Sequence, residues 1–163
     1  MTIIGGLPAH ALLLHFVVVL VPLIAALEIV CACWPAARRG ALLWLTLILA
    51  TANMVLTPVT INAGEWLYDL RVSPSPILRE HAERGELMIY FSAALLAVAI
   101  GLAVLRLSER RSEKGGRATK VIVVVVTLAV GIASMVQIYR VGDAGAQSVW
   151  GGDVAHLQKA HGG

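Results

Sequence analysis

The sequence predicts an all-α integral membrane protein: a bundle of four transmembrane helices with both termini on the outer, extracytoplasmic side. Hydrophobic residues make up 58% of the 163 residues and charged residues only 14%, and the mean hydropathy is +0.81. A soluble domain of this length needs more polar surface than that. Four apolar stretches are each long enough to cross a hydrocarbon core of about 30 Å, which takes about 20 residues of helix. We therefore expect one transmembrane domain, residues 1–152, with helices over about 8–33, 41–61, 77–107 and 120–141, and a flexible tail over 153–163.

We expect the first stretch to be a transmembrane helix that is retained rather than a cleaved signal peptide. The segment before Pro8 lacks the basic residues that begin a secretory signal peptide. Pro8 suits the first helical position, where a missing N–H costs little. Pro22 interrupts the same stretch near mid-membrane and permits a kink there.

The second and fourth stretches each carry a polar stripe at helical spacing, which predicts a face turned into the bundle. The structural interpretation is that small and hydroxyl side chains let the helices pack closely and hydrogen-bond to one another. The third stretch follows a Ser-Pro-Ser-Pro breaker at 73–76 and is expected to project beyond the bilayer. The stripes consist of Thr46, Asn53, Thr57 and Thr60 in the second stretch, and of Thr127, Gly131, Ser134 and Gln137 in the fourth.

Basic residues indicate the orientation, because short loops rich in Lys and Arg stay in the cytoplasm. The sequence pI of about 9.2 is therefore a membrane-topology signal rather than a nucleic-acid surface. We expect the cytoplasmic (inner) membrane of a bacterium. Eight of the 13 basic residues lie in the first and third connections: Arg38, Arg39, Arg106, Arg110, Arg111, Lys114, Arg117 and Lys120.

This threading places all five histidines on the outer side, where imidazole is both a common metal ligand and an easily titrated group. His15 lies five residues after His10, which is about 7.5 Å deeper and about 140° round the helix, so the two rings do not easily share one small ion. We expect the deeper ring, that of His15, to point into the bundle. Its candidate partners are His81 and Glu86 of the third helix, and Glu65 and Asp69 after the second. His156 and His161 fall in the tail and are given no role.

Two chemistries suit such a cluster. Histidines from facing helices, here His10, His15 and His81, can hold the iron of haem b. Alternatively, His15 and His81 with Glu86 and Glu65 can hold a divalent metal ion. The leading hypothesis is a redox or electron-transfer role, beside a redox protein or respiratory complex.

Other functions remain open. The chain could be an accessory subunit that packs its polar stripes against a larger complex, or a small transporter formed by homo-oligomers. Glu28 and Asn53 would line the transport path. A carboxylate within the membrane costs about 2.5–3.5 kcal/mol, although Glu28 could instead reach cytoplasmic water, Arg38 or Arg39. Hydrolase, ATPase and dinucleotide motifs are missing from the sequence, so we expect no stand-alone catalytic activity.

The segment 5–16, Gly-Gly-Leu-Pro-Ala-His-Ala-Leu-Leu-Leu-His-Phe, resembles the opening of a bacterial family of small four-helix membrane proteins filed as a domain of unknown function. The family typically begins His-Pro-Leu-Leu-Val-His. Further matches are His81 with Gly-Glu at 85–86, and the segment 139–150, so that the likeness runs from about residue 5 to residue 152.

The resemblance implies four helices and a membrane location. It also implies a redox setting, because members are sometimes fused to Rieske-type or other redox modules, and it adds weight to His10, His15, His81 and Glu86. Two positions depart from the family pattern. Ala11 replaces a proline, and Asp143 replaces a histidine, which leaves Asp143 to orient a histidine or to pair with Arg140.

Overall fold

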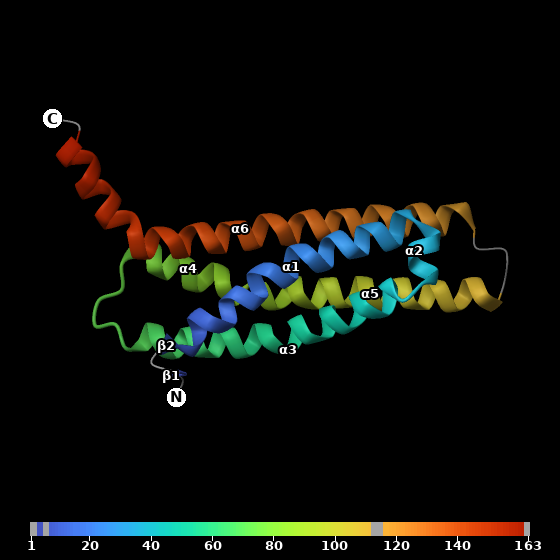
Figure 1. Ribbon diagram of the computed structural model, residues 1–163, viewed down its shortest axis with the longest axis horizontal. Helices are drawn as coiled ribbons and strands as arrows, with labels where there is room; N and C mark the ends of the chain where they lie inside the picture. The colour runs from blue at the N-terminus through green and yellow to red at the C-terminus, as the bar shows by residue number, and fades with distance from the viewer. Residues whose placement is uncertain (1–2, 5–6, 112–115, 162–163) are drawn as a thin grey trace.

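The computed structural model describes residues 3–4, 7–111 and 116–161, and almost all of this part of the chain is helical (Figure 1). A two-residue strand pair, antiparallel β1 and β2, precedes the first helix. The elements are β1 (Ile3–Ile4), β2 (Leu7–Pro8), α1 (Ala9–Cys33), α2 (Pro35–Arg39), α3 (Leu42–Asp69), α4 (Pro76–Glu86), α5 (Met88–Arg111) and α6 (Arg117–His161).

Within the described residues, four helical spans are long and apolar enough to cross a membrane: Ala9–Cys33, Leu42–Asp69, Pro76–Arg111 and Ala118–Gly152. The predicted all-α membrane fold is therefore confirmed. An even number of spans places the two ends of the described chain on the same side, and both termini lie at one end of the bundle (Figure 1). That this side is extracytoplasmic stays a prediction from the loop charges.

The core forms where α1, α3, α5 and α6 meet, and the outward faces remain apolar. Phe16, Ile48, Val104 and Ile132 are each more than half exposed, which suits contact with lipid rather than water. The larger buried cluster is formed by Val17, Val21, Ile24, Ala25, Ala50, Met88, Leu95, Ala99, Ile138 and Val141.

At the end of the bundle that holds both termini, the helices extend further than the sequence predicts. The second helix continues to Asp69, eight residues beyond the expected end, so Glu65 belongs to α3. The third stretch is divided at Leu87 into α4 and α5. Ser75 starts α4 by accepting a hydrogen bond from the Leu78 N–H at 3.3 Å.

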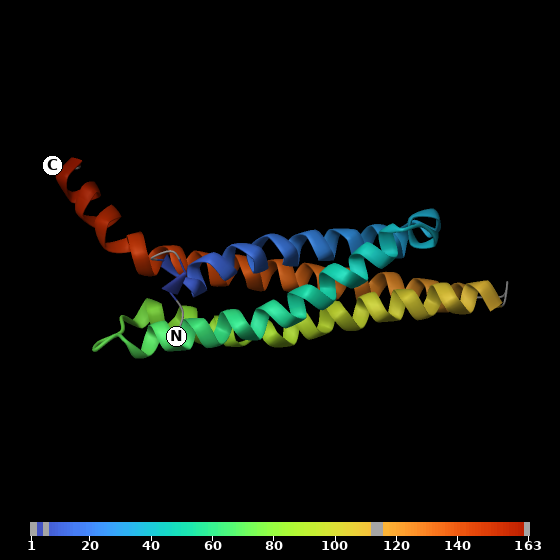
Figure 2. The same cartoon turned by 60° about the horizontal axis from the view of Figure 1, so that its bottom comes forward.

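The expected end of the fourth helix at Val141 is wrong, because α6 continues to His161, through most of the predicted flexible tail. Each glycine in a helix costs about 1 kcal/mol relative to alanine, but α4 packs against this part of α6 and offsets that cost. The last turns of α6 bend away from the bundle (Figures 1 and 2).

Both polar stripes face the bundle interior, as predicted: Thr46, Asn53, Thr57 and Thr60 are buried on α3, as are Thr127, Gly131, Ser134 and Gln137 on α6. Asn53 Nδ2 donates to Ser92 Oγ of α5 at 2.9 Å, and Ser92 Oγ also bonds Thr57 Oγ1 at 2.8 Å. The three threonines of the α3 stripe also donate to carbonyls one turn earlier in their own helix. The α3 stripe therefore ties α3 to α5, which is the packing role weighed above, whereas Thr127 Oγ1 and Ser134 Oγ of the α6 stripe are buried without a hydrogen-bond partner among the described residues.

Candidate functional site

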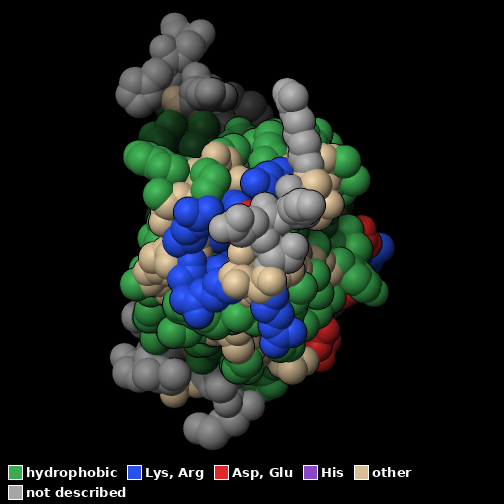
Figure 3. Space-filling view, turned by 90° about the vertical axis from the view of Figure 1, so that its right-hand side faces the viewer, with side chains coloured by type: hydrophobic (Ala, Val, Ile, Leu, Met, Phe, Trp, Pro, Cys, Tyr) green, Lys and Arg blue, Asp and Glu red, His purple; other side chains and the backbone are tan. Residues whose placement is uncertain are grey.

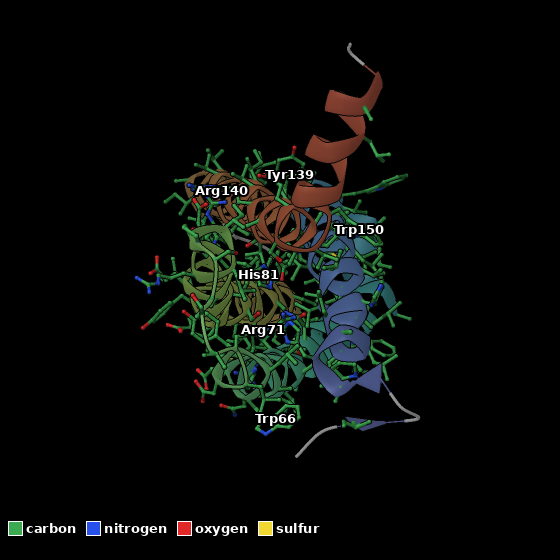
Figure 4. All side chains as sticks on the ribbon, turned by 90° about the vertical axis from the view of Figure 1, so that its left-hand side faces the viewer. Trp66, Arg71, His81, Tyr139, Arg140 and Trp150 are labelled. Carbon is green, nitrogen blue, oxygen red and sulfur yellow. The ribbon has the colours of Figure 1, made fainter. Side chains whose placement is uncertain are left out.

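The end of the bundle that holds both termini brings together two histidines from different helices, His10 at the start of α1 and His81 in the middle of α4. Their ring centroids are 6.2 Å apart and their planes are nearly perpendicular, at 84°. Both side chains are part-buried. Figure 4 looks onto this end and shows His81 among the helices, with Trp66, Tyr139 and Trp150 towards the periphery.

The His10 ring lies against α3. Its Nδ1 atom is 2.9 Å from the carbonyl oxygen of Thr60. One turn further along α3, Gly64 leaves space for the ring, since a Cβ there would come within 2.8 Å of His10 Cε1 and Nδ1. A residue other than glycine would displace the ring, so Gly64 sets how closely α1 approaches α3.

The His81 ring lies against α6 in the same manner. Its Nδ1 atom is 3.0 Å from the carbonyl oxygen of Val141, and a Cβ at Gly145 would come 2.9 Å from its Cε1 atom. Two further hydrogen bonds join α4 to α6: Gln137 Nε2 donates to Arg84 O at 2.9 Å, and Arg84 Nη1 donates to Arg140 O at 3.3 Å. The last turn of α4 therefore has a fixed position on α6.

These hydrogen bonds determine which nitrogen of each ring is protonated and which keeps a lone pair that could bind a metal ion. A carbonyl oxygen only accepts hydrogen bonds, so Nδ1 of each ring carries the proton that it donates. In a neutral imidazole the other nitrogen, Nε2, then keeps its lone pair. This is the arrangement in which a backbone carbonyl orients a metal-binding histidine and fixes its tautomer. Both His10 and His81 have it.

His15 does not join this pair, and the expectation that its ring points into the bundle is wrong. Its side chain is exposed on the outward face of α1, and its Nδ1 atom bonds the carbonyl oxygen of Ala11 in the same helix. This local bond satisfies one ring nitrogen without a partner from another helix. The shallower histidine, His10, faces inward instead.

The carboxylates predicted as metal ligands are not brought to the histidines. Glu65, Asp69 and Glu86 are exposed. Within residues 3–4, 7–111 and 116–161, the structure contains no group of three or more His, Cys, Asp or Glu side chains placed to hold a metal ion. The candidate site is thus a pair of nitrogen donors rather than a mixed His and carboxylate cluster. The side chains of His156 and His161 lie outside the described part.

The α6 segment 139–150, which carries part of the resemblance noted above, contacts α4 through backbone carbonyls, those of Arg140 and Val141. Asp143 is exposed and accepts a hydrogen bond from Gln147 Nε2 at 2.8 Å, one turn along α6. Arg140 is also exposed, and its carbonyl receives the Arg84 guanidinium. Neither the expected pairing of Asp143 with Arg140 nor a contact of Asp143 with a histidine is among the described interactions.

Glu28 is fully buried on α1, and neither carboxyl oxygen has a hydrogen-bond partner among the described residues. Arg38, one of the cations it was expected to reach, is engaged elsewhere: Arg38 Nη2 is 2.8 Å from Glu109 Oε1. Asn53 Oδ1 is likewise buried without a partner. Glu28 is therefore a carboxyl group enclosed within the bundle.

Sequence reasoning missed the features that hold the histidines. The glycines at 64 and 145 each lie four residues after the carbonyl that accepts the histidine proton, at Thr60 and Val141. The glycines themselves are visible in the sequence, but the carbonyls are not distinguished by residue type, so only the packing shows that each glycine shares a helix face with the accepting carbonyl.

A scan of protein families finds one that covers nearly the whole chain, described as "Predicted membrane protein (DUF2231)", over residues 6–158. The chain belongs to this family. Both histidines of the pair, and the α6 segment against which His81 lies, fall within the match. Neither the curated proteins nor the solved structures include one that matches the chain. The chain is thus a member of a membrane protein family of unknown function, and its bundle contacts the lipid bilayer.

Proposed function

We propose that the His10–His81 pair binds a transition-metal ion through its two free Nε2 atoms, either as the iron of haem b or as a single divalent ion. The protein would act in or beside electron transfer in the cytoplasmic membrane of a bacterium. One observation carries the proposal: two imidazoles from separate helices lie 6.2 Å apart, each with Nδ1 on a backbone carbonyl.

The donor set fits this chemistry. Imidazole nitrogen suits iron, copper, zinc and nickel, whereas magnesium and calcium prefer oxygen ligands. Two histidines on facing helices, His10 and His81, are a donor set that could hold a haem iron. Such a group supplies a one-electron couple when it is haem iron or copper. The chain's part is to hold one ring against α3 and the other against α6.

The test is to purify the full chain from membranes in detergent, record its visible spectrum with and without reductant, and measure metals by elemental analysis. A Soret band with near-stoichiometric iron would identify haem b, and a near-stoichiometric metal without that band would identify a free ion. His10→Ala and His81→Ala should each lose the bound group. His15→Ala is the matched control and should keep it, because that ring lies outside the pair.

A spectrum without a Soret band, together with substoichiometric metal, would overturn the proposal. The two imidazoles would then be hydrogen-bonding groups between helices, which favours the accessory-subunit hypothesis. Co-purification with a larger complex, and instability of the chain alone, would support that alternative.

Transport is a second candidate, favoured by the enclosed carboxyl group of Glu28. A buried carboxyl without a partner is costly unless it is protonated or hydrated. Such a group can carry a proton between bound waters. If the chain transports protons or cations, Glu28→Gln should abolish flux in proteoliposomes and leave the metal content unchanged; flux that is insensitive to Glu28→Gln would remove this candidate.

A further inference from the structure

The opposite end of the bundle holds a cluster of arginines that the histidine site does not involve. Figure 3 looks onto this end, where α2 and the end of α5 meet, and shows Lys and Arg side chains gathered across it. A cavity of about 190 Å³ lies there, lined by Arg39, Arg106, Glu109 and Arg110. Three guanidinium groups therefore surround one small space.

One carboxylate, that of Glu109, lines the cavity, which is too few to neutralise the three arginines that line it as well. Glu109 Oε1 is paired with Arg38 at 2.8 Å, and Arg38 is only 1% exposed. Arg38 also donates to the carbonyl oxygen of Cys31 at 2.7 Å, at the end of α1. Because Glu109 also forms an ion pair with this fourth arginine, the arginines outnumber the carboxylate and the cavity keeps an excess of positive charge.

The Arg106 side chain is buried and only partly hydrogen-bonded within the described residues. It lines the cavity but is only 8% exposed, and its Nη1 atom donates to the Arg38 carbonyl at 3.1 Å. Its Nε atom is buried without a hydrogen-bond partner among the described residues. A buried guanidinium needs a partner to offset its desolvation, and an anion in the cavity would supply one.

Membrane topology alone does not require this arrangement. The positive-inside rule is satisfied by exposed basic residues near the ends of the spans, such as Arg39 at the end of α2 and Arg110 near the end of α5. Burying Arg38 and Arg106 adds a desolvation cost that orientation does not demand. The buried pair therefore indicates a positioned anion site.

A groove beside the cavity indicates which anion. It has a volume of about 290 Å³ and an apolar wall that includes Leu105, Val121, Val124 and Val125, with Arg38 and Lys120 also lining it. Arg38 lines the groove and Glu109 lines the cavity, so their ion pair lies between the two spaces. A ligand with an anionic head and an apolar chain matches both.

We propose that this end of the bundle binds an anionic phospholipid of the adjacent leaflet. Its phosphate lies among Arg39, Arg106 and Arg110, and the first part of an acyl chain follows the groove along α6. Basic pockets at the cytoplasmic ends of transmembrane helices recognise lipid phosphates in this way. The site shares no residue with the histidine pair, so either proposal can fail without the other.

The experiment measures lipid retention by the full chain in detergent, by native mass spectrometry after exchange into micelles that contain phosphatidylglycerol or phosphatidylcholine. We expect preferential retention of phosphatidylglycerol. Arg110→Gln and Arg106→Gln should each weaken that retention about fivefold, the equivalent of about 1 kcal/mol per basic residue. Arg79→Gln is the charge-matched control, because Arg79 is exposed on α4 at the other end.

If Arg106→Gln fails to fold, Arg110→Gln still tests the proposal, because Arg110 is exposed and lines the cavity. Equal retention of the two lipids would overturn the proposal, and so would equal effects of Arg110→Gln and Arg79→Gln. Inorganic phosphate is the second probe. If millimolar phosphate binds at the arginines and the protein retains no phospholipid, the site serves a soluble anion and the lipid assignment is wrong.

Discussion

Gly145→Ala directly tests the contact of the His81 ring with α6. The added Cβ would lie 2.9 Å from His81 Cε1 and 3.0 Å from its Nδ1 atom, both closer than ordinary van der Waals contact. The ring is not free to yield without cost, because Nδ1 is bonded to the carbonyl oxygen of Val141 at 3.0 Å. The substitution must therefore either strain the contact between α4 and α6 or break that hydrogen bond.

The magnitude follows from two opposing terms. Replacing a helical glycine by alanine stabilises the folded state by about 0.5–1 kcal/mol. Overpacking costs about 1–3 kcal/mol, and loss of the hydrogen bond alone costs about 0.5–1.5 kcal/mol. We expect Gly145→Ala to change the free energy of unfolding by between about 0 and −2 kcal/mol.

Gly142→Ala is the matched control, since Gly142 lies on the same helix three residues away and a Cβ there meets nothing within 4 Å. It should gain the propensity term alone. The two variants should thus differ by about 1–3 kcal/mol in unfolding by SDS in mixed micelles. For a domain of this length, each kcal/mol moves the melting temperature by about 2–4 °C.

A double-mutant cycle with His81→Ala isolates the contact. Without the ring, Gly145→Ala should no longer be destabilising, which gives a coupling energy of about 1–3 kcal/mol between the two positions. Equal stabilities of Gly145→Ala and Gly142→Ala, or a coupling energy near zero, would refute the placement of His81 against α6.

Three further predictions concern the rest of the bundle. Arg38→Ala leaves Glu109 without its partner at a largely buried site and should destabilise the protein by about 3–5 kcal/mol in the same unfolding assay. Asn53→Ala removes the bond to Ser92 and should cost about 1 kcal/mol, the usual size for polar contacts between transmembrane helices. His15→Ala should stay within about 0.5 kcal/mol of wild type, because its ring is exposed and bonded only within α1 among the described interactions.

The first two variants each have a matched control. Arg39→Ala removes an exposed arginine beside Arg38, and Thr51→Ala removes an exposed hydroxyl from the same helix as Asn53. Losses as large in these variants as in Arg38→Ala and Asn53→Ala would contradict the assigned contacts. A loss above about 1 kcal/mol in His15→Ala would contradict the outward orientation of that ring.

Hydropathy and helical spacing were sufficient to predict the spans and the inward stripes. A helix buries Asn53, Thr57 and Thr60 on one face, whereas a strand would place Thr57 and Thr60 on opposite faces. Phe16 and Ile132 are exposed, which suits an apolar surrounding such as lipid. The bilayer thickness imposes the length of each span. These are local constraints, so they can be recognised without knowing how the helices are arranged.

The histidine pair could not be predicted fully, because its choice depends on how α1 is rotated against α3. The angular separation of His10 and His15 says that one faces inward, not which one. Depth favoured His15, yet that ring satisfies one nitrogen on the Ala11 carbonyl of its own helix. His10 faces inward because Gly64 leaves it space.

Long-range contacts account for the other misses. Arg38 and Glu109 are 71 residues apart and both fall outside the predicted helices, so no local pattern indicates that they pair. The predicted end of the fourth helix at Val141 is too early because a glycine-rich segment begins at Gly142 and glycine is common just after a helix end. The packing of α4 on α6, where the His81 ring lies against Val141 and Gly145, supports the helix past Gly142.

The most direct test of the histidine pair is the X-ray absorption spectrum at the edge of the metal that the purified chain retains. We predict the multiple scattering of two imidazole ligands in the wild type and in His15→Ala, whereas His10→Ala and His81→Ala should retain no metal. A wild-type chain that retains no metal or haem, or a metal retained without imidazole scattering, would contradict the account.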